Sequence, residues 1–223
     1  MKSKRLIQLP KGYLSYSQAQ LWLNDQHKYA QLYFDNRDEL RTTNLGQEYG
    51  KVVATLLERG EQSEDLLTDT AMFLLKKYDL ADKEIVTTLK TKDVDVPLLL
   101  RPDSMDSTTK AFLEYKTGKH PWTQHKAQNH LQLKFYALGI YNEFGVLPPS
   151  IELIWIETEQ VEIAGQGDGP NVKEIKPTGR IETFPVTYTI KDILETSALI
   201  LRVAKEIEVA FTMHTPDPRV AVF

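Results

Sequence analysis

Apolar residues recur at the spacing of an amphipathic helix in several parts of the chain. The predicted helices cover residues 15–35, 45–60, 64–80, 123–145 and 190–214. Ser15 or Ser17 can cap the first helix and Thr123 the fourth, because a hydroxyl accepts hydrogen bonds from the free N–H groups of the first turn. Gly60 and Gly145 stand where the second and fourth helices should stop.

Between the helices, β-branched and apolar residues dominate, which favours strands. Three such runs within residues 84–117, EIVTTLKTKD, VDVPLLLRPD and KAFLEYK, predict a three-stranded meander. Residues 151–163 and 182–190 predict two further strands, whereas the glycines and prolines of 164–179 favour a loop or a hairpin excursion. With helix 123–145 as a crossover into a parallel strand, the order of elements predicts an α/β (α+β) core.

The length of 223 residues fits a single domain that can bury a sizeable core. We expect this core within about 13–163, followed by a C-terminal strand–helix extension at about 164–223. No apolar run is long enough to span a bilayer, and the start MKSKRLIQLPKGYLSYS lacks the apolar segment of a signal peptide. We therefore expect a cytoplasmic protein without a membrane partner.

The absence of cysteine and the net charge of −4 limit the kinds of site and binding surface that the chain can form. Without cysteine the chain can form no disulfide, no zinc–cysteine site and no cysteine-bound iron–sulfur cluster. The acidic balance argues against a large non-specific basic surface. Any contact with nucleic acid must therefore come from a local patch.

Two charged residues project from one side of the strand predicted in FLEYKTGK (112–119). Glu114 and Lys116 alternate with apolar residues, so their side chains leave the strand on the same side, about 6.7 Å apart. A surface strand could carry such a pair only to stay soluble. The neighbouring residues must decide between a solvated face and a site.

A second carboxylate, Asp103, comes just before the predicted turn SMDSTTK. A turn centred in the middle of that segment would place Asp103 opposite Phe112 or Leu113. That position is one step from Glu114. Two carboxylates so close repel each other unless a cation lies between them, and a divalent cation binds carboxylate oxygens well. The arrangement indicates a metal site.

A third feature is the pair Gln132 and Tyr136, which lie four residues apart and so share one helix face. Such a pair is common on amphipathic helices, but here it completes an ordered set: Asp103, the strand EYKTGK and the helix segment QLKFY. This set resembles the PD-(D/E)XK nuclease superfamily, specifically its RecB-like exonuclease branch of phage and bacterial type. The resemblance implies a restriction-endonuclease-like core, a mixed sheet flanked by helices.

Two upstream segments extend the resemblance, which covers roughly residues 13–160. YLSYSQAQLWL looks like the branch's first helix, which starts with a Leu-Ser-x-Ser pattern. The next predicted helix looks like the branch's G-x-x-x-H-x-x-x-E helix, with Gly50 and Glu58 in place. Ala54 stands where many relatives carry a metal-binding histidine, so Glu58 or Glu48 would have to supply that ligand.

The resemblance implies a site for Mg²⁺, for which Mn²⁺ can substitute, and no iron–sulfur cluster. The implied metal ligands are Asp103, Glu114, the carbonyl of Tyr115, and Glu58. Lys116 would orient the attacking water or offset the charge of the transition state. Gln132 and Tyr136 would position the backbone or the Lys116 side chain. The implied catalytic set is therefore Asp103, Glu114, Lys116, Gln132 and Tyr136.

Basic and aromatic residues gather after this strand and could contact phosphates and bases. They are Lys119, His120, Trp122, His125, Lys126 and Lys134. Each alone is an ordinary surface residue. Beside the motif, they predict a DNA-binding patch.

These features predict a divalent-metal-dependent nuclease that hydrolyses DNA phosphodiester bonds, an exonuclease of DNA recombination, repair or phage DNA processing. DNA is the expected partner, and a helicase or recombination partner stays open. So do two alternatives. One is a catalytically weak or inactive nucleic-acid-binding module of the same fold, and the other is a metal-dependent enzyme on a non-nucleic substrate. The sequence leaves polarity, strandedness and the choice between ends and internal bonds undecided.

Overall fold

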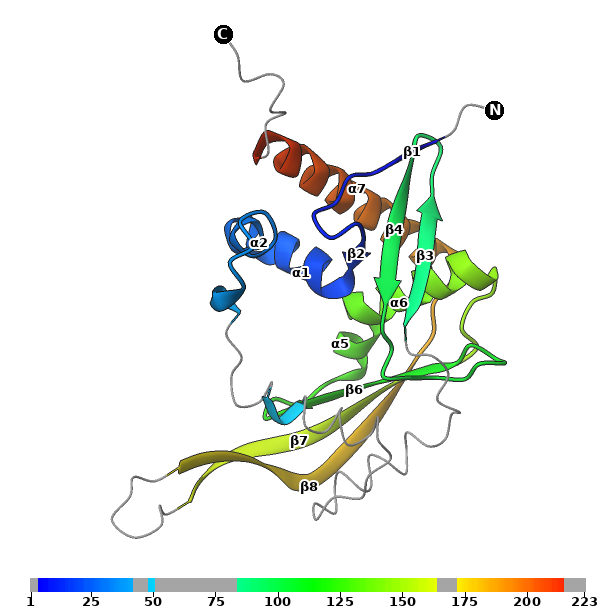
Figure 1. The fold of residues 1–223 in the computed structure, drawn as a ribbon. Coiled ribbons are helices and arrows are strands. Elements are labelled where there is room, and N and C mark those ends of the chain that lie inside the picture. Colours follow the sequence, from blue (N-terminus) through cyan, green and yellow to red (C-terminus); the bar gives the residue numbers. More distant parts are fainter. Residues whose placement is uncertain (1–3, 42–47, 51–83, 164–171, 215–223) are drawn as a thin grey trace.

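The computed structural model describes residues 4–41, 48–50, 84–163 and 172–214, and it contains two β-sheets with helices packed around them (Figure 1). The fold is mixed α/β, as the sequence predicts. The predicted helices 45–60 and 64–80 lie outside the described residues, apart from 48–50, which are helical.

The first sheet is built around β4 (Val94–Leu100). β3 (Ile85–Lys90) pairs with β4 in antiparallel orientation. Two short N-terminal strands, β1 (Arg5–Leu6) and β2 (Leu14–Ser15), pair with β4 in parallel orientation. Because β4 has partners on both edges, its last three residues, all leucines, are buried.

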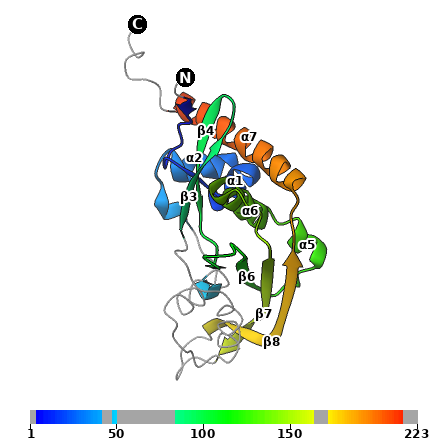
Figure 2. The ribbon, with the colours of Figure 1, turned by 90° about the vertical axis from the view of Figure 1, so that its right-hand side faces the viewer.

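The second sheet has the strand order β5 (Ser104–Met105), β6 (Phe112–Gly118), β7 (Ile151–Ile163) and β8 (Val172–Val186). β6 and β7 run parallel, so the predicted crossover into a parallel strand is confirmed. The bounds of β7 are those predicted. In Figure 1, the far ends of β7 and β8 extend away from the labelled helices, and Figure 2 shows the same two strands at the bottom of the view.

The three-stranded meander predicted for residues 84–117 is wrong. β3 and β4 form a hairpin in the first sheet, whereas β5 and β6, the next strands along the chain, belong to the second sheet. The chain changes sheets just after β4, at Arg101 and Pro102. Proline has no backbone N–H to continue a strand ladder, which favours a break at this point.

The first predicted helix is two helices, α1 (Tyr16–Asn24) and α2 (Gln26–Tyr33). Ser15 caps α1, as predicted. Asp25 interrupts the helical backbone, and its carboxylate accepts a hydrogen bond from a backbone N–H of the second helix. Aspartate competes with a continuing helix in this way, so one helix ends and a new one begins.

The fourth predicted helix is likewise two helices, α5 (Gln124–Gln128) and α6 (Leu131–Phe144). Thr123 caps α5 and Gly145 ends α6 with a φ of 72°, so both predicted ends are confirmed. The break falls at His130, whose backbone is extended. The asparagine before it donates both its backbone N–H and its side-chain amide to the His125 carbonyl of α5, which satisfies the end of that helix.

The closing helix α7 (Ile190–His214) has the predicted bounds and packs against α1 and α6. Arg5 of β1 donates two hydrogen bonds to the Glu208 carboxylate, which ties the N-terminal segment to α7. A short 3₁₀ turn, η1 (Asp38–Leu40), follows α2. None of the helices within the described ranges is long and apolar enough to cross a membrane.

Of the loop or hairpin excursion predicted for residues 164–179, the structure shows the hairpin, because β8 starts at residue 172 and pairs with β7 in antiparallel orientation. β8 then ends at Val186, four residues before the predicted end. β8 stands at one end of its sheet's strand order, where Pro177 is tolerated because an edge strand can lose a ladder donor. Gly179 has a φ of 104°, which glycine adopts without strain. The first part of the predicted loop lies outside the described residues.

Helix α6 packs against β3 and β4 of the first sheet as well as against α1 and α7. Helix α6 comes close to β4 at Gly139. A Cβ atom there would overlap the side chain of Leu100, which is fully buried at the end of β4. The absence of a side chain at Gly139 therefore allows α6 to lie directly on the sheet.

We expect Gly139→Ala to lower the free energy of unfolding, measured by urea denaturation. Overpacking a core costs about 1–3 kcal/mol. The higher helix propensity of alanine returns at most about 1 kcal/mol. Gly118→Ala is the control, because a Cβ there meets no described atom within 4 Å. Equal stability of Gly139→Ala and the wild type would show that Leu100 can move aside.

Candidate active site

Strand β6 bears two charged side chains, one in the interior of the molecule and one nearer its surface. Its first four residues are buried, because β6 is an inner strand between β5 and β7. Glu114 is only 2% exposed, whereas Lys116, nearer the end of the strand, is half-buried. As the alternation predicts, both side chains leave the strand on one side and meet each other.

Glu114, Lys116 and Gln132 form a closed triangle of hydrogen bonds. The Lys116 ammonium donates to Glu114 Oε1 and to Gln132 Oε1, at 2.7 Å in each case. Gln132 Nε2 donates to the same Glu114 Oε1 at 2.5 Å. Gln132 lies on α6, so the triangle joins that helix to β6.

Tyr136, one turn further along α6, extends this network to the first sheet. Its hydroxyl accepts a hydrogen bond from Gln132 Nε2 at 3.0 Å and donates one to the carbonyl of Arg101 at 2.8 Å. Both amide protons of Gln132 and its carbonyl oxygen are therefore occupied. The orientation of the Gln132 amide follows from its three partners.

Asp103 lies opposite Glu114, one residue before β5. Ser104 pairs with Leu113, which places the preceding residue, Asp103, across from Glu114. One carboxylate oxygen of Asp103 accepts a hydrogen bond from the backbone N–H of Tyr115 at 3.0 Å. The two carboxylates are thus brought together by strand pairing.

The predicted position of Asp103 opposite Phe112 or Leu113 is wrong by at least one residue. The turn is centred later than expected, because Asp106 accepts hydrogen bonds from the N–H groups of Thr108 and Thr109. Lys110 then adopts a left-handed φ of 67°. Local turn chemistry decides the register here.

The network holds Lys116 in its charged form. Burial by itself would lower the pKa of this ammonium, but the charges of Glu114 and Asp103 outweigh burial, and the pKa is raised. Burial also raises the pKa of Tyr136, with a further contribution from Glu114, so its hydroxyl keeps its proton as a donor. The site therefore presents a fixed ammonium beside two carboxyl groups.

Glu114 Oε2, unlike Oε1, is buried without a hydrogen-bond partner among the described residues. A buried carboxylate oxygen is costly unless something compensates it. The Asp103 carboxylate lies opposite, and carboxylate oxygens are hard donors that Mg²⁺ and Mn²⁺ prefer. The residues present therefore fit a divalent cation. Within the described ranges no three His, Asp or Glu side chains gather into a complete ligand set.

The proposed fourth ligand, Glu58, and the departure at Ala54 lie outside the described residues. Glu48 is described and exposed. Gly50 lies beside the end of β6, because a Cβ there would come within 3.3 Å of Thr117 Oγ1. The start of this helix therefore adjoins the Lys-Thr-Gly end of the strand.

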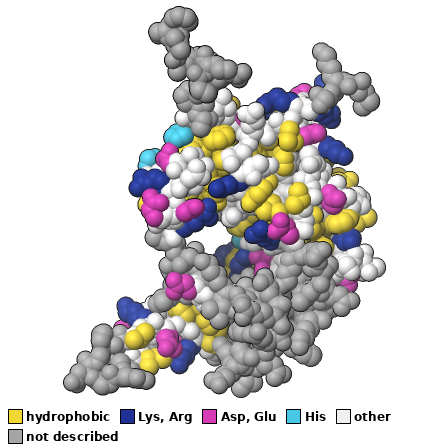
Figure 3. All heavy atoms as spheres, viewed as in Figure 1, with side chains coloured by type: hydrophobic (Ala, Val, Ile, Leu, Met, Phe, Trp, Pro, Cys, Tyr) yellow, Lys and Arg dark blue, Asp and Glu magenta, His cyan; other side chains and the backbone are white. Residues whose placement is uncertain are grey.

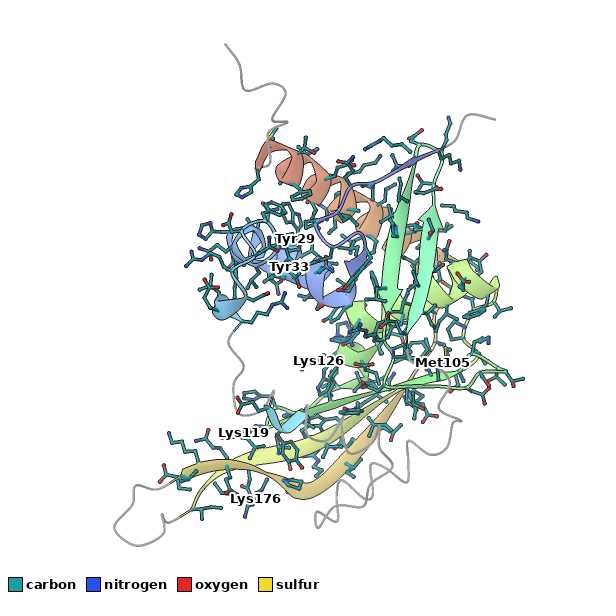
Figure 4. The ribbon with its side chains drawn as sticks, in the orientation of Figure 1. Tyr29, Tyr33, Met105, Lys119, Lys126 and Lys176 are labelled. Carbon is teal, nitrogen blue, oxygen red and sulfur yellow. The ribbon has the colours of Figure 1, made fainter. Side chains whose placement is uncertain are left out.

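The predicted DNA-binding patch comes from several elements. Lys119, His120, His125 and Lys126 are exposed, and Trp122 and Lys134 are half-buried. Lys126 Nζ lies 4.1 Å from the centre of the Trp122 ring, so these two residues come together. Lys134 interacts with Asp192 on α7. Its charge adds to the lowering of the Asp192 pKa, which is caused chiefly by hydrogen bonds from Thr189. Figure 4 shows Lys119 and Lys126 apart, the first just after the end of β6 and the second on α5.

Several residues at this site carry no signal that sequence reasoning used. A pocket of about 520 Å³ adjoins Lys116, Gln132 and Tyr136, and its lining includes Lys11, Tyr16, Ser17, Arg41 and Arg101. His130 packs between Tyr16 and Trp122, with ring centres 5.9 and 5.0 Å away. Burial, together with Lys116 and Lys126, lowers the pKa of His130 to about 4, so its ring is neutral. The Leu-Ser-x-Ser pattern indicates where α1 starts, but it does not indicate that Tyr16 and Ser17 line a pocket.

Comparisons with known proteins assign no family. No protein-family model and no curated protein matches the chain. Among solved structures, one similar chain is a protein of Eubacterium rectale whose assignment as an exonuclease is itself provisional. It has 12% identity and a TM-score of 0.46 over 87% of this chain and 82% of its own. A second, SSO0001, has 12% identity and a TM-score of 0.41 over 91% of this chain and 78% of its own. At these scores neither likeness assigns a function.

We expect Glu114→Gln to lower the pKa of Lys116, measured by NMR titration of its ammonium group. The substitution removes a charge that raises this pKa and leaves the burial that lowers it. Glu182→Gln is the matched control, because Glu182 pairs with Arg180 on β8. An unchanged Lys116 pKa in Glu114→Gln would contradict the electrostatic coupling of the pair.

Proposed function

We propose that this protein is a divalent-metal-dependent nuclease that hydrolyses phosphodiester bonds of DNA. The observation that carries the proposal is the buried Glu114 carboxylate. One of its oxygens is held by Lys116 and Gln132, and the other lacks a hydrogen-bond partner among the described residues. Asp103 lies opposite on the paired strand. The resemblance of the motif order to RecB-like nucleases supports the same function.

The residues that would hold Mg²⁺ are Asp103, Glu114 and the carbonyl of Tyr115, with Glu58 as the proposed fourth ligand. Mn²⁺ would substitute, since both ions take oxygen donors. When bound, the ion supplies a Lewis acid that polarises the scissile phosphate and the attacking water.

Lys116 is the proposed catalytic cation. An ammonium group has three donor protons, and Glu114 and Gln132 take two of them. The third can donate to a phosphate oxygen or to the attacking water. Because the triangle already fixes the position of the Lys116 ammonium group, this group does not have to be reoriented when the substrate binds. A donor fixed in advance stabilises the negative charge that develops in the transition state.

Gln132 and Tyr136 are positioning residues. They hold Lys116 and Glu114 in place through the contacts to Glu114 Oε1 and the Arg101 carbonyl. The DNA-binding patch, including Trp122 and Lys126, would contact the strand outside the reacting bond. By resemblance, we propose action at DNA ends, in recombination, repair or phage DNA processing.

Lys116→Ala should reduce metal-stimulated cleavage of labelled DNA by at least about 10²-fold, since loss of one fixed donor to a transition-state oxyanion costs this much. Metal binding, measured by calorimetry, should remain largely intact. Asp103→Asn should weaken both. Lys191→Ala is the control, because Lys191 is an exposed lysine paired only loosely with Glu195 on α7.

Linear, circular, single-stranded and double-stranded DNA should be tested together with RNA, with Mg²⁺, with Mn²⁺ and with chelator. Cleavage that disappears with chelator and in Lys116→Ala supports the proposal. Binding of DNA without cleavage of any substrate would favour a nucleic-acid-binding module instead.

Glu58→Gln should raise the Mg²⁺ concentration needed for half-maximal activity, because it removes a proposed carboxylate ligand. Ala54→His should shift the preference toward Mn²⁺, since imidazole suits transition metals better than Mg²⁺. The measurement is a metal titration of cleavage rate. If Glu58→Gln shows the same metal dependence as the wild type, Glu58 is not a metal ligand.

A further inference from the structure

The pocket beside Lys116 has the size of a small-ligand site. Its volume of about 520 Å³ lies within the range of roughly 300–1,000 Å³ found for such sites. Lys116, Gln132 and Tyr136 form one part of its lining, and Tyr16 and Ser17, in the first turn of α1, form another. This space suits one nucleotide-sized group and is too small for a base-paired duplex.

Among the residues that the structure describes, every charged side chain that lines the pocket is a cation. These side chains are Lys11, Arg41, Arg101 and Lys116, and no carboxylate is among the described residues of the lining. The chain as a whole carries a net charge of −4. Lys and Arg side chains on the face in Figure 3 lie interspersed with Asp and Glu. The pocket therefore differs in charge from the visible surface and would attract an anion.

Three of these cations can turn toward a ligand. Arg41 pairs with Asp38 and Arg101 with Glu84, and all four side chains of these pairs are largely exposed. Exposed ion pairs contribute little free energy, so an anion in the pocket can replace their carboxylates. Lys11 makes no ion pair within the described parts of the chain.

The start of α1 adds uncharged donors. The backbone N–H groups of the first turn of a helix lack intrahelical partners. Ser15 Oγ accepts the N–H of Gln18 and lies 3.0 Å from Ser17 Oγ, so two hydroxyls also stand at this end. Such a helix start favours negative charge, and here it adds to the four cations.

A row of rings leads out of the pocket. Tyr16 lines the pocket and contacts His130, which in turn contacts Trp122, and Lys126 lies against the Trp122 ring. Unpaired bases can stack on aromatic side chains whatever their sequence. A strand that follows these rings would reach the pocket beside Lys116.

We infer that this pocket holds a phosphate group of single-stranded DNA next to the bond that is cut, with Lys11 and Arg101 among its ligands. The inference rests on the proposed nuclease function and adds the part of the substrate that the enzyme recognises. A terminal phosphate monoester is the preferred occupant, because its second negative charge gains more from Lys11, Arg41 and Arg101 than the single charge of a diester does. The pocket then recognises the end of a strand.

The test is binding of an internally labelled single-stranded oligothymidylate to the full chain in chelator, where no metal supports cleavage. Three versions are compared by fluorescence anisotropy, with a 5′-phosphate, with a 3′-phosphate and with no terminal phosphate. We expect one phosphorylated version to bind about tenfold more tightly than the unphosphorylated one, as for one additional charge-assisted contact. Lys11→Ala and Arg101→Ala should remove most of this difference. Lys191→Ala should retain it, and thermal melting checks that each variant is folded.

The pattern of losses identifies the phosphate. If Lys11→Ala and Arg101→Ala remove the preference for a phosphorylated end, the pocket holds a terminal phosphate monoester. If both variants weaken all three versions equally, the pocket holds an internal phosphodiester. Unchanged affinities for all three versions in both folded variants would overturn the inference.

The binding test and the cleavage test fail separately. If Lys116→Ala cleaves DNA like the wild type while Lys11→Ala loses the phosphate-dependent affinity, the catalytic proposal falls and the phosphate pocket stands. If Lys116→Ala loses cleavage while Lys11→Ala and Arg101→Ala bind all three versions normally, the nuclease stands and the pocket has no part in phosphate binding.

Discussion

The burial of the Glu114 carboxylate is the constraint on which the arrangement of the site depends. A carboxylate at 2% exposure is stable only with partners, because the interior solvates a charge poorly. Its partners come from its own strand, through Lys116, and from α6, through Gln132. Because one partner lies on the helix, compensation of this charge also ties α6 to β6.

The same helix holds the two sheets together. Tyr136 reaches the carbonyl of Arg101 at the end of the first sheet, and Gly139 brings α6 onto Leu100 one residue earlier. The chain leaves β4 at this point and enters the second sheet with Asp103. The change of sheet that places Asp103 opposite Glu114 is thus anchored by the helix that also binds Glu114.

The charge of the whole chain says little about the charge of its site. The chain is acidic overall, yet the described charged residues around the pocket are cations drawn from four separate segments, near residues 11, 41, 101 and 116. Screening in solution limits the influence of distant surface charges, so a ligand in the pocket responds mainly to this local set. Composition therefore excludes a broad basic surface without excluding a basic pocket.

The sequence by itself determined the features that depend on a few neighbouring residues. The bounds of β7 and α7, the caps at Ser15 and Thr123, and the shared side of Glu114 and Lys116 all follow from local spacing and side-chain chemistry. Only the tertiary structure decided that β8 begins at residue 172, that β4 and β6 belong to different sheets, and that Lys11 and Arg101 line one pocket. Those outcomes depend on pairing and packing between segments far apart in the chain, which no local pattern of residues specifies.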